Sequence, residues 1–276
     1  ALGYMLNVFN LGSRAENPAA DAPEPGPGTE PAVAIIVAAR HEPREVLEET
    51  IITFRNVEYP AKTIYFLDDS SDQAYKDEAD ALAREHGIKI FRREERHGAK
   101  AGIVNDFLRT MPEKYLAIFD ADQNPMPDFL KEIVPILEAD PRLAFVQTPQ
   151  FYTNIGESPV AKGAAMQQAI FYETICEGKN VSGSMFCCGT NVVFRRDALL
   201  DVGGFEEEFI TEDFATSVNL HMKSWRSLYH NHVLAFGRAP ETLPAYFKQQ
   251  ARWAGGTLSV FRKLVLNFYK HPLKLS

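Results

Sequence analysis

Cysteine is scarce in this sequence, and a long apolar run is missing altogether. Cys176, Cys187 and Cys188 are the three cysteines, and they show neither zinc-type spacing nor a disulfide framework. Their scarcity indicates a reducing compartment, and Cys176 is expected to fill a small space in the core. Because no stretch of about 20 apolar residues occurs, the sequence predicts no helix that spans a bilayer.

An excess of basic charge is also missing. The 29 Lys and Arg residues are outnumbered by 37 Asp and Glu residues, which gives a formal net charge of −8. Proteins that bind nucleic acids usually neutralise phosphates with a basic surface, so we expect no nucleic-acid partner. The chain does have length and apolar content. Its 276 residues, 45% of them hydrophobic, can bury a substantial core in one large α/β domain or two small ones.

Short apolar runs alternate with helical patterns in the first half of the chain. They begin after residues 13–31, a linker rich in Pro, Gly, Ala and acidic residues. Continuous apolar strands alternating with helices are typical of a mostly parallel sheet covered by helices on both faces. Residues 151–276 are more helical and less regular. The expected strands are 32–39, 63–69, 88–93, 115–120 and 143–149, and the expected helices follow Pro43 and occupy 71–87, 99–111 and 127–140.

The stretch YLAIFDADQNPMPDFL, residues 115–130, ends a buried strand on two carboxylates. Asp120 and Asp122 repel each other, and each costs free energy to desolvate. Asp68 and Asp69 end another strand, and ligands of parallel sheets sit at the carboxyl ends of strands. A lone Asp-x-Asp is most often a solvated loop. Two acidic pairs at one sheet edge instead favour a site for Mg²⁺ or Mn²⁺ and a phosphate-bearing ligand.

Two further motifs stand at helix starts. His97 and Lys100 come just before a helix, where a cation and the free amides of the first turn can bind an anion. Taken alone, they are better explained as ordinary loop polarity. Glu212 and Asp213 follow Thr211, and the routine explanation is that Thr211 caps a helix.

The segment QQARW combines Gln249, Arg252 and Trp253. Arg can grip a phosphate through two hydrogen bonds, and Trp offers a flat face on which a sugar ring can stack. The alternative is an amphipathic helix with one buried Trp. His230 and His232 alternate along an expected strand and could chelate a metal. No third ligand stands at a useful spacing, so we interpret them as structural.

Both ends of the chain suggest a membrane. Residues 1–12 are similar to the last turns of a membrane helix. Residues 258–276 combine helically spaced apolar residues with basic ones, as in an amphipathic helix that lies in a membrane interface. The alternative is a terminal helix packed on its own domain. The apolar residues are Phe261, Leu264, Val265 and Phe268, and the basic ones are Arg262, Lys263, Lys270 and Lys274.

Seven ordered motifs, LDDSS, HGAKAG, FDAD, QTPQF, FCCGT, TEDF and QQARW, carry a resemblance to a known family. Together they resemble the processive β-glycan synthases of the inverting GT-A glycosyltransferases, such as cellulose synthase and its close relatives. The resemblance covers residues 32 to 262. It implies an α/β domain of GT-A fold at 32–257, with a nucleotide-sugar-binding half at 32–150 and an acceptor-binding half at 151–257.

The resemblance also implies a metal-dependent inverting transferase that moves a sugar, glucose first, from a UDP-sugar to the non-reducing end of a β-glucan. Asp213 matches the general base, with Glu212 beside it. Asp122 and Asp120 match the site of Mg²⁺ or Mn²⁺. The residues that match the nucleotide-sugar site are Asp68, Asp69, Lys100, Asp120, Gln249 and Arg252, and those that match the acceptor site are Trp253, Phe186, Cys188, Gly189 and Thr190.

The sequence departs from the family's pattern at Arg40 and His41, which replace an aromatic residue and an amide near the nucleobase. Other donors therefore stay open: UDP-N-acetylglucosamine for a chitin-like or hyaluronan-like product, GDP-mannose for a mannan, or a single transfer to a lipid. Outside this class, a nucleotidyltransferase or a non-catalytic nucleotide-sugar sensor could also use strand-end carboxylates. The resemblance implies a polysaccharide acceptor and a place on the cytoplasmic face of the plasma membrane, with flanking transmembrane segments outside this chain.

Overall fold

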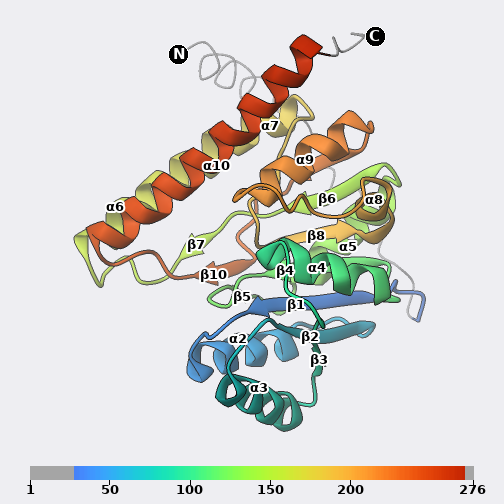
Figure 1. The fold of residues 1–276 in the computed structure, drawn as a ribbon, viewed down its shortest axis with the longest axis vertical. Helices are drawn as coiled ribbons and strands as arrows, with labels where there is room; N and C mark the ends of the chain where they lie inside the picture. Colours follow the sequence, from blue (N-terminus) through green and yellow to red (C-terminus); the bar gives the residue numbers. More distant parts are fainter. Residues whose placement is uncertain (1–27, 271–276) are drawn as a thin grey trace.

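The structure is a computed structural model that describes residues 28–270, with side chains described as far as residue 266. At its centre lies a seven-stranded sheet in the order β3-β2-β1-β4-β8-β6-β9 (Figure 1). Every neighbouring pair is parallel except the two that β8 makes with β4 and β6. The predicted, mostly parallel sheet is therefore confirmed. The strands are β1 (Val33–Ala39), β2 (Lys62–Asp68), β3 (Lys89–Phe91), β4 (Tyr115–Phe119), β6 (Leu143–Gln147), β8 (Val192–Arg195) and β9 (Arg226–Tyr229).

Helices cover both faces of this sheet, each face over its own hydrophobic core. Side chains of β1 alternate between the faces: Val33, Ile35 and Val37 join one core, and Ala34 and Ile36 join the other. Burial on both faces explains why the strands are unbroken apolar runs in the sequence. The first core is closed by α2 (Arg44–Asn56), α3 (Gln73–His86) and α5 (Phe129–Ala139), and the second by α4 (Ala99–Thr110), α8 (Arg196–Asp201) and α9 (Glu212–Met222).

The predicted strands and helices of the first half are present, with differences at their ends. The clearest is in the third strand, where the predicted span 88–93 shortens to Lys89–Phe91. Arg92 and Arg93 leave the strand because their side chains bind the two carboxylates at the end of β2.

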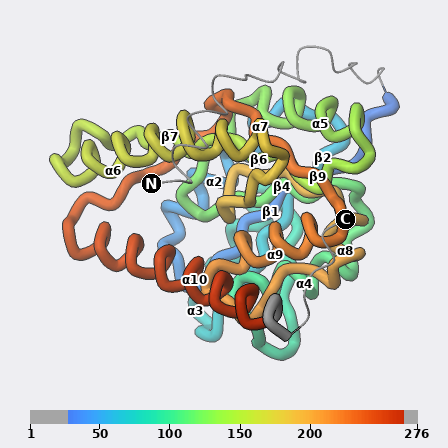
Figure 2. The backbone as a smooth tube through the Cα atoms, turned by 90° about the horizontal axis from the view of Figure 1, so that it is seen from above, coloured from blue at the N-terminus to red at the C-terminus, as the bar shows by residue number. Residues whose placement is uncertain are grey.

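A three-stranded sheet and two helical segments complete the described chain. The small sheet has the order β5-β10-β7. Helix α6, a π-helix η1 and α7 follow one another without a break. Helix α10 contacts α6, and the view from above in Figure 2 shows the two helices drawing apart along their length. Tyr246 on α10 donates its hydroxyl proton to Gln167 on α6 (2.7 Å). The elements are β5 (Asn124–Pro125), β7 (Phe151–Tyr152), β10 (Ala235–Gly237), α6 (Pro159–Ile170), η1 (Phe171–Cys176), α7 (Glu177–Val181) and α10 (Leu243–Lys270).

Helix α10 is continuous over 28 residues. It contains both QQARW and the first part of the predicted interfacial segment 258–276, so the predicted boundary at 257/258 falls inside one helix. Phe261 is mostly exposed on it. The side chain of Phe268, and residues 1–27 with their predicted membrane segment, lie outside the described part. In the part that the structure describes, no helix has both the length and the hydropathy needed to cross a membrane.

Candidate active site

The acidic strand ends lie along one edge of the central sheet. β1, β2 and β4 are parallel, so their carboxyl ends share this edge, and the antiparallel β8 begins there. Asp68 ends β2, Asp120 follows β4, and residues 189–191 lead into β8. Because β1 separates β2 from β4 and neighbouring strands are about 4.8 Å apart, the two strand ends stand roughly 10 Å from each other.

Lys100 connects the end of β4 to the segment before β8. It lies in the first turn of α4, where its ammonium pairs with Asp120 and donates to the carbonyl oxygen of Gly189 (3.0 Å). The backbone N–H of Asp120 in turn donates to Oγ1 of Thr190 (2.9 Å). Desolvation lowers the pKa of Lys100, but the carboxylates of Asp120 and Glu212 outweigh it, so the pKa lies above its ordinary value. Lys100 is therefore a fixed positive charge among acids.

His97 does not join this cluster, although the sequence places it with Lys100 in a predicted anion site. Its Nδ1 contacts Glu207 (2.6 Å) and its Nε2 contacts Asp106 (3.0 Å). The imidazole is thus occupied by carboxylates, which repel an anion. It joins α4 to the loop before α9 instead.

Asp213 is a half-buried carboxyl group whose pKa is raised to about 7. Desolvation is the main cause, and the neighbouring carboxylate of Glu212 adds to it. Its Oδ2 lies against Gly189, where a Cβ would stand only 3.0 Å away. Gly189 also has a φ of 81°, a conformation that glycine adopts most readily. A carboxyl group with a pKa near 7 can exchange a proton at neutral pH.

Thr211 stands at the N-cap position of α9, as predicted, but the predicted side-chain cap is missing. Its hydroxyl makes no capping hydrogen bond to α9, and its Oγ1 is buried without a hydrogen-bond partner among the described residues. Helix α10 approaches from the other side, so closely that a Cβ on Gly256 would lie 2.5 Å from Cγ2 of Thr211. The carboxylate of Asp213 accepts the N–H of Phe214 instead (2.8 Å). The acids of TED therefore belong to the site and not only to a helix start.

Two residues outside the predicted site hold the CCGT segment in place. Gln147, at the end of β6, accepts the N–H of Cys188 and donates to the carbonyl of Thr190, both at 2.8 Å. Ser217 on α9 accepts the N–H of Cys187 and donates to the carbonyl of Asp213, both at 2.8 Å. Gln147 belongs to the quoted QTPQF motif, but nothing in the sequence shows its partners. For Ser217, the only signal in the sequence is its i+4 spacing from Asp213.

A cavity of about 360 Å³ lies between η1, the segment before β8, α9 and α10. Asp213 and Trp253 both line it, with Phe186 and Cys188 from the predicted acceptor set. Flat rings can pack on the apolar faces of a sugar while nearby polar groups bond to its hydroxyls. The wall has both kinds of group, because Phe171, Tyr172 and Phe214 alternate with Gln150, Gln167, Gln168 and Gln250.

These four glutamines are site residues that sequence reasoning missed. Gln168 donates to Gln150, and Gln167 on α6 donates to Gln250 on α10, both at 3.1 Å. Gln250 lines the cavity, whereas the predicted Gln249 is half-buried beside it. The i, i+3 spacing of Gln250 and Trp253 is the signal that could have found it.

Glu212 lies close to two basic residues, Lys100 and Arg252. Desolvation raises its pKa, and the positive charges of Lys100 and Arg252 oppose this rise. The exposed Arg252 is therefore close enough to act on the acidic cluster, although it belongs to α10. The structure thus brings Lys100, Asp120, Glu212, Asp213 and Arg252 into one electrostatic group.

Asp120 and Asp122 form an acidic pair that fits a divalent cation. The pKa of Asp122 is raised, first by desolvation and then by the charge of Asp120. Desolvation is the main cause of the raised pKa of Tyr152, and the charges of both acids add to it. The Tyr152 hydroxyl accepts a hydrogen bond from Gln168 at the cavity wall (3.0 Å). A cation that prefers oxygen ligands would stabilise the ionised form of Asp122 next to the charge of Asp120. Mg²⁺ or Mn²⁺ fits this donor set.

Asp68 and Asp69 are bound by arginines from the loop after β3. Arg92 binds Asp68 (2.6 Å), Arg93 binds Asp69 through two hydrogen bonds (2.9 Å each), and Arg96 binds Asp69 at 3.0 Å. Desolvation opposes ionisation of Asp69, but the two arginines outweigh it and lower its pKa. A nucleobase that bonds to Asp69 must therefore share this carboxylate with them.

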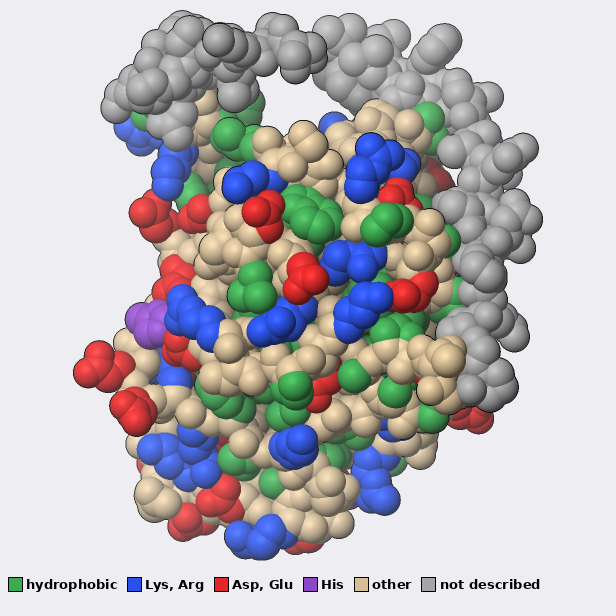
Figure 3. All heavy atoms as spheres, turned by 90° about the vertical axis from the view of Figure 1, so that its right-hand side faces the viewer, with side chains coloured by type: hydrophobic (Ala, Val, Ile, Leu, Met, Phe, Trp, Pro, Cys, Tyr) green, Lys and Arg blue, Asp and Glu red, His purple; other side chains and the backbone are tan. Residues whose placement is uncertain are grey.

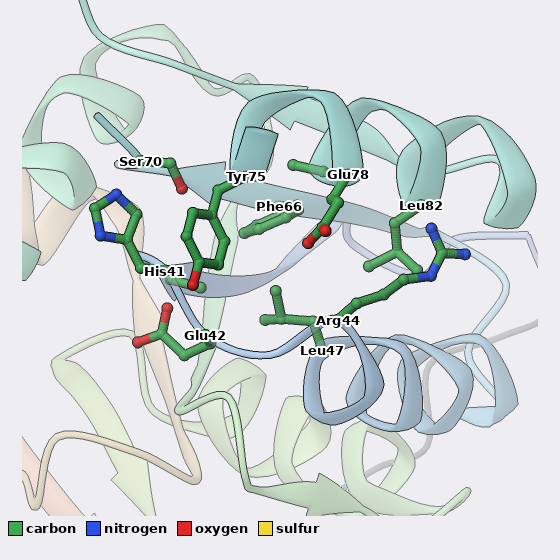
Figure 4. Close-up of a pocket in the computed structure, with 11 residues that line it drawn as sticks. His41, Glu42, Arg44, Leu47, Phe66, Ser70, Tyr75, Glu78 and Leu82 are labelled. Atoms are coloured by element: carbon green, nitrogen blue, oxygen red, sulfur yellow. The ribbon is translucent and has the colours of Figure 1, made fainter. Parts of the chain in front are cut away.

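His41 fills space next to these acids. It stacks on Tyr75, with ring centroids 4.7 Å apart, and its Nε2 accepts the N–H of Ser71 (3.1 Å). Figure 4 shows the two rings side by side at a small pocket between α2 and α3, with Ser70 close by. The pocket measures about 10 Å³, room for about one water molecule, so the residue that replaces the family's amide packs against its own chain.

Three curated proteins show which relatives this chain resembles. Cellulose synthase 2 of Novacetimonas hansenii is 31% identical over 240 residues, a match that covers 84% of this chain and 15% of that protein. A UDP-forming cellulose synthase catalytic subunit from Dictyostelium discoideum is 40% identical over 168 residues, covering 59% and 16%. The cellulose synthase catalytic subunit of Pseudomonas fluorescens is 30% identical over 240 residues, covering 84% and 32%. The chain thus spans less than a third of each relative.

Solved structures show the same fold. A mannosyltransferase from Pyrobaculum calidifontis, in complex with GDP-Man and Mn²⁺, has a TM-score of 0.71 at 20% identity, covering 95% of this chain and 76% of that one. TarS of S. aureus in complex with UDP-GlcNAc has a TM-score of 0.55 at 15% identity, covering 76% and 59%. The predicted GT-A fold is confirmed. Residues 31–256, which hold the sheet edge, the acidic pair and the cavity, match the family described as Glycosyltransferase like family 2, and the chain belongs to it.

Proposed function

We propose that the chain is the catalytic domain of a membrane-associated β-glycan synthase, which transfers glucose from UDP-glucose to the non-reducing end of a growing β-glucan such as cellulose. The observation that carries the proposal is that Asp213 belongs both to the cavity and to the charged cluster. It lines the cavity that also holds Trp253, and it lies within the charge cluster of Lys100 and Asp120. In this proposal the base lies between the acidic pair that binds the cation and a cavity large enough for a sugar. This is the arrangement needed to transfer a sugar from a nucleotide donor to a glycan.

Asp213 is the general base of the proposed reaction. A sugar hydroxyl is far too weak an acid to ionise at neutral pH, so its proton must pass to a base as the oxygen attacks the anomeric carbon. Asp213 takes this proton. Attack on the face opposite the departing diphosphate forms the new glycosidic bond, breaks the old one and inverts the anomeric configuration, without a covalent enzyme intermediate.

The leaving diphosphate is stabilised by fixed positive charge. Lys100 and Arg252 supply it from two sides, in positions that also influence Glu212. Held by Asp122 and Asp120, Mg²⁺ or Mn²⁺ would supply further charge neutralisation at the diphosphate. In this proposal Asp68 and Asp69 lie on the nucleoside side and Gln249 supports the pyrophosphate site.

The acceptor glycan occupies the cavity, with its terminal sugar on Trp253 and with Phe186 and Cys188 along its wall. Gly189 and the buried Thr190, also predicted for the acceptor site, do not line the cavity and instead support this segment from behind. The domain lies on the cytoplasmic face of the plasma membrane, with the end of α10 in the interface. Exposed apolar side chains on α10, Leu258 and Phe261 among them, support this placement.

Calorimetric titration of the chain with UDP tests the donor site. UDP should bind with Mn²⁺ or Mg²⁺ and be released by EDTA, and Asp122→Ala should weaken binding at least about tenfold, because the cation loses a ligand. Asp77→Ala, a surface carboxylate on α3, is the matched control. Unchanged metal-dependent binding in Asp122→Ala contradicts the ligand role. A screen of nucleotide sugars with the intact membrane protein, read as UDP release and product linkage, then tests glucose as the donor sugar.

A further inference from the structure

We propose that Glu132, His230 and His232 form a binding site for a transition-metal ion, Zn²⁺ in the first place, with a different ligand chemistry from the acidic pair of the active site. The two histidines follow β9, and the third ligand comes from α5, about 100 positions earlier in the chain. This distance in sequence is why the histidine pair had no visible third partner. In this proposal the two histidines act as ligands, in place of the structural role predicted from the sequence.

Three potential ligand atoms converge on one point. Nε2 of His230 lies 3.0 Å and Nδ1 of His232 lies 2.7 Å from the same carboxylate oxygen of Glu132. All three ligand atoms lie within 4.8 Å of one another. Around a tetrahedral zinc ion with bonds near 2.1 Å, ligand atoms are about 3.4 Å apart, so small side-chain movements suffice to admit the ion. An ordinary ion pair needs one imidazole, whereas here two converge.

The surroundings supply one rigid ligand and an open position. The His230 side chain is 7% exposed and that of His232 is 55% exposed. The backbone is fixed too, because His230 donates its N–H to Gln147 (2.9 Å) and His232 donates its N–H to His230 (2.8 Å). A fourth ligand, water or a solute, can approach from the His232 side.

Two imidazoles and one carboxylate select against the cation expected at the active site. Imidazole suits Zn²⁺ and neighbouring transition metals, while Mg²⁺ prefers oxygen ligands throughout. A second cluster, Glu48, Glu85 and His86, also gathers three ligand atoms, but it has one imidazole and an exposed glutamate. It provides an internal comparison.

The proposed ion would join α5 to the connection between β9 and β10. This connection runs beside the segment after Asp122, where Met126 donates its N–H to Leu234 (2.8 Å) and β5 pairs with β10. Metal binding at Glu132 would therefore brace the segment that follows the acidic pair. Its role is to position that segment, since none of the three ligands lines the cavity.

Zinc binding to the purified chain, measured by competition with a chromophoric chelator, tests the site. The wild type should bind one Zn²⁺ in the presence of excess Mg²⁺, and saturating Zn²⁺ should raise its Tm by about 5 °C. His232→Asn and Glu132→Gln should each weaken binding at least about tenfold. His232 is exposed enough for the fold to survive, which circular dichroism checks.

His86→Asn and Asp122→Ala are the matched controls, and both should retain zinc binding. Loss of binding in either control would move the zinc to another site and overturn the proposal. Binding that persists in His232→Asn, for example through the thiols, would do the same, as would a wild type with no saturable binding. The UDP titration measures the donor site in a separate experiment, so the zinc site and the proposed transfer can be contradicted independently.

Discussion

Asp213 keeps a proton in the folded chain at a pH where an ordinary carboxyl group has lost it. Its pKa is raised from 3.8 to about 7, mainly by desolvation and further by Glu212. Between these two values the folded state binds a proton that the unfolded state releases. Stability therefore falls as the pH rises through this range, and the destabilisation is fully present above the folded pKa.

Asp213→Asn should separate stability from activity. The neutral amide avoids the desolvated charge, so the Tm of the variant should exceed that of the wild type at about pH 8 and approach it near pH 4. Sugar transfer should fall by about 10²-fold or more, because the base is gone, while UDP binding persists. Thermal scans across pH, and UDP release by the intact protein, measure the two effects. Normal turnover in the variant would remove the base assignment.

Single residues show how far a sequence can predict this site. Asp120, Asp122 and Asp213 could be found because their motifs have a fixed order along the chain. Gln147 and Glu132 could not, because their partners lie 41 and about 100 positions away and only folding brings them together. Hydrogen bonds between distant segments leave no periodic pattern in a sequence.

At the scale of elements, α10 approaches α9 closely because Gly256 has no side chain. A Cβ at Gly256 would meet Thr211, whereas nothing lies within 4 Å of a Cβ at the adjacent Gly255. The same substitution to alanine can therefore be made at two adjacent positions, one with open space for the Cβ and one without. The close approach also sets the position of Trp253 on the same helix face.

Gly255→Ala should stabilise the chain by about 0.5 to 1 kcal/mol, because alanine is the better helix former. Gly256→Ala should instead destabilise it by about 1 to 3 kcal/mol through overpacking against Thr211, and it should weaken acceptor use by displacing Trp253. Urea unfolding of the two variants measures the difference. Equal stabilisation by both would show that α10 is free to shift.

His97 connects α4 to the loop before α9 through a pH-dependent contact. Hydrogen bonding to Glu207 is the main cause of its raised pKa, and Asp106 contributes. A raised histidine pKa adds stability that is fully present below 6.5, its ordinary value, and is lost as the pH rises through the folded value.

His97→Asn should remove this pH dependence. The wild type should lose about 1 to 2 °C of Tm relative to the variant between about pH 6 and 9, a small effect because the pair is largely exposed. Parallel thermal scans measure it. Identical pH profiles for the two proteins would show that the contact adds no stability.

The elements themselves were more predictable than their ends. Apolar runs fixed the strands of the first half, since both faces of the sheet are buried. The third strand ends early because Arg92 and Arg93 bind the acids at the end of β2. Thr211 at the start of α9 lacks its predicted side-chain hydrogen bond, and α10 packs against it. Tertiary contacts decided both cases against local preference.

At the scale of the whole molecule, charge is distributed without a dominant sign on the face in Figure 3, where described Lys and Arg side chains lie among Asp and Glu side chains. Exposed apolar residues instead collect along α10, where Leu243, Phe247, Leu258 and Phe261 are each more than half exposed. In the proposed placement at the membrane, these side chains would face the lipid.

The proposed membrane placement predicts that the chain binds lipid vesicles through α10. Leu258→Asp should weaken binding to vesicles containing anionic lipid by about tenfold or more, since a buried leucine contributes about 1.5 to 3 kcal/mol. Leu200→Asp, a partly exposed leucine on α8, is the control and should have little effect. Cosedimentation with vesicles measures both. An equal loss in the two variants would assign the binding to general hydrophobicity.

The reversed strand β8 has a consequence for how the polypeptide can be divided. It follows residue 150 in the sequence but is inserted between β4 and β6, which both precede residue 150. A polypeptide severed near residue 150 would leave its leading fragment with an unfilled seam through the middle of its sheet. The two pieces could regain the native architecture only by complementation, with the later one threading a strand into the earlier one.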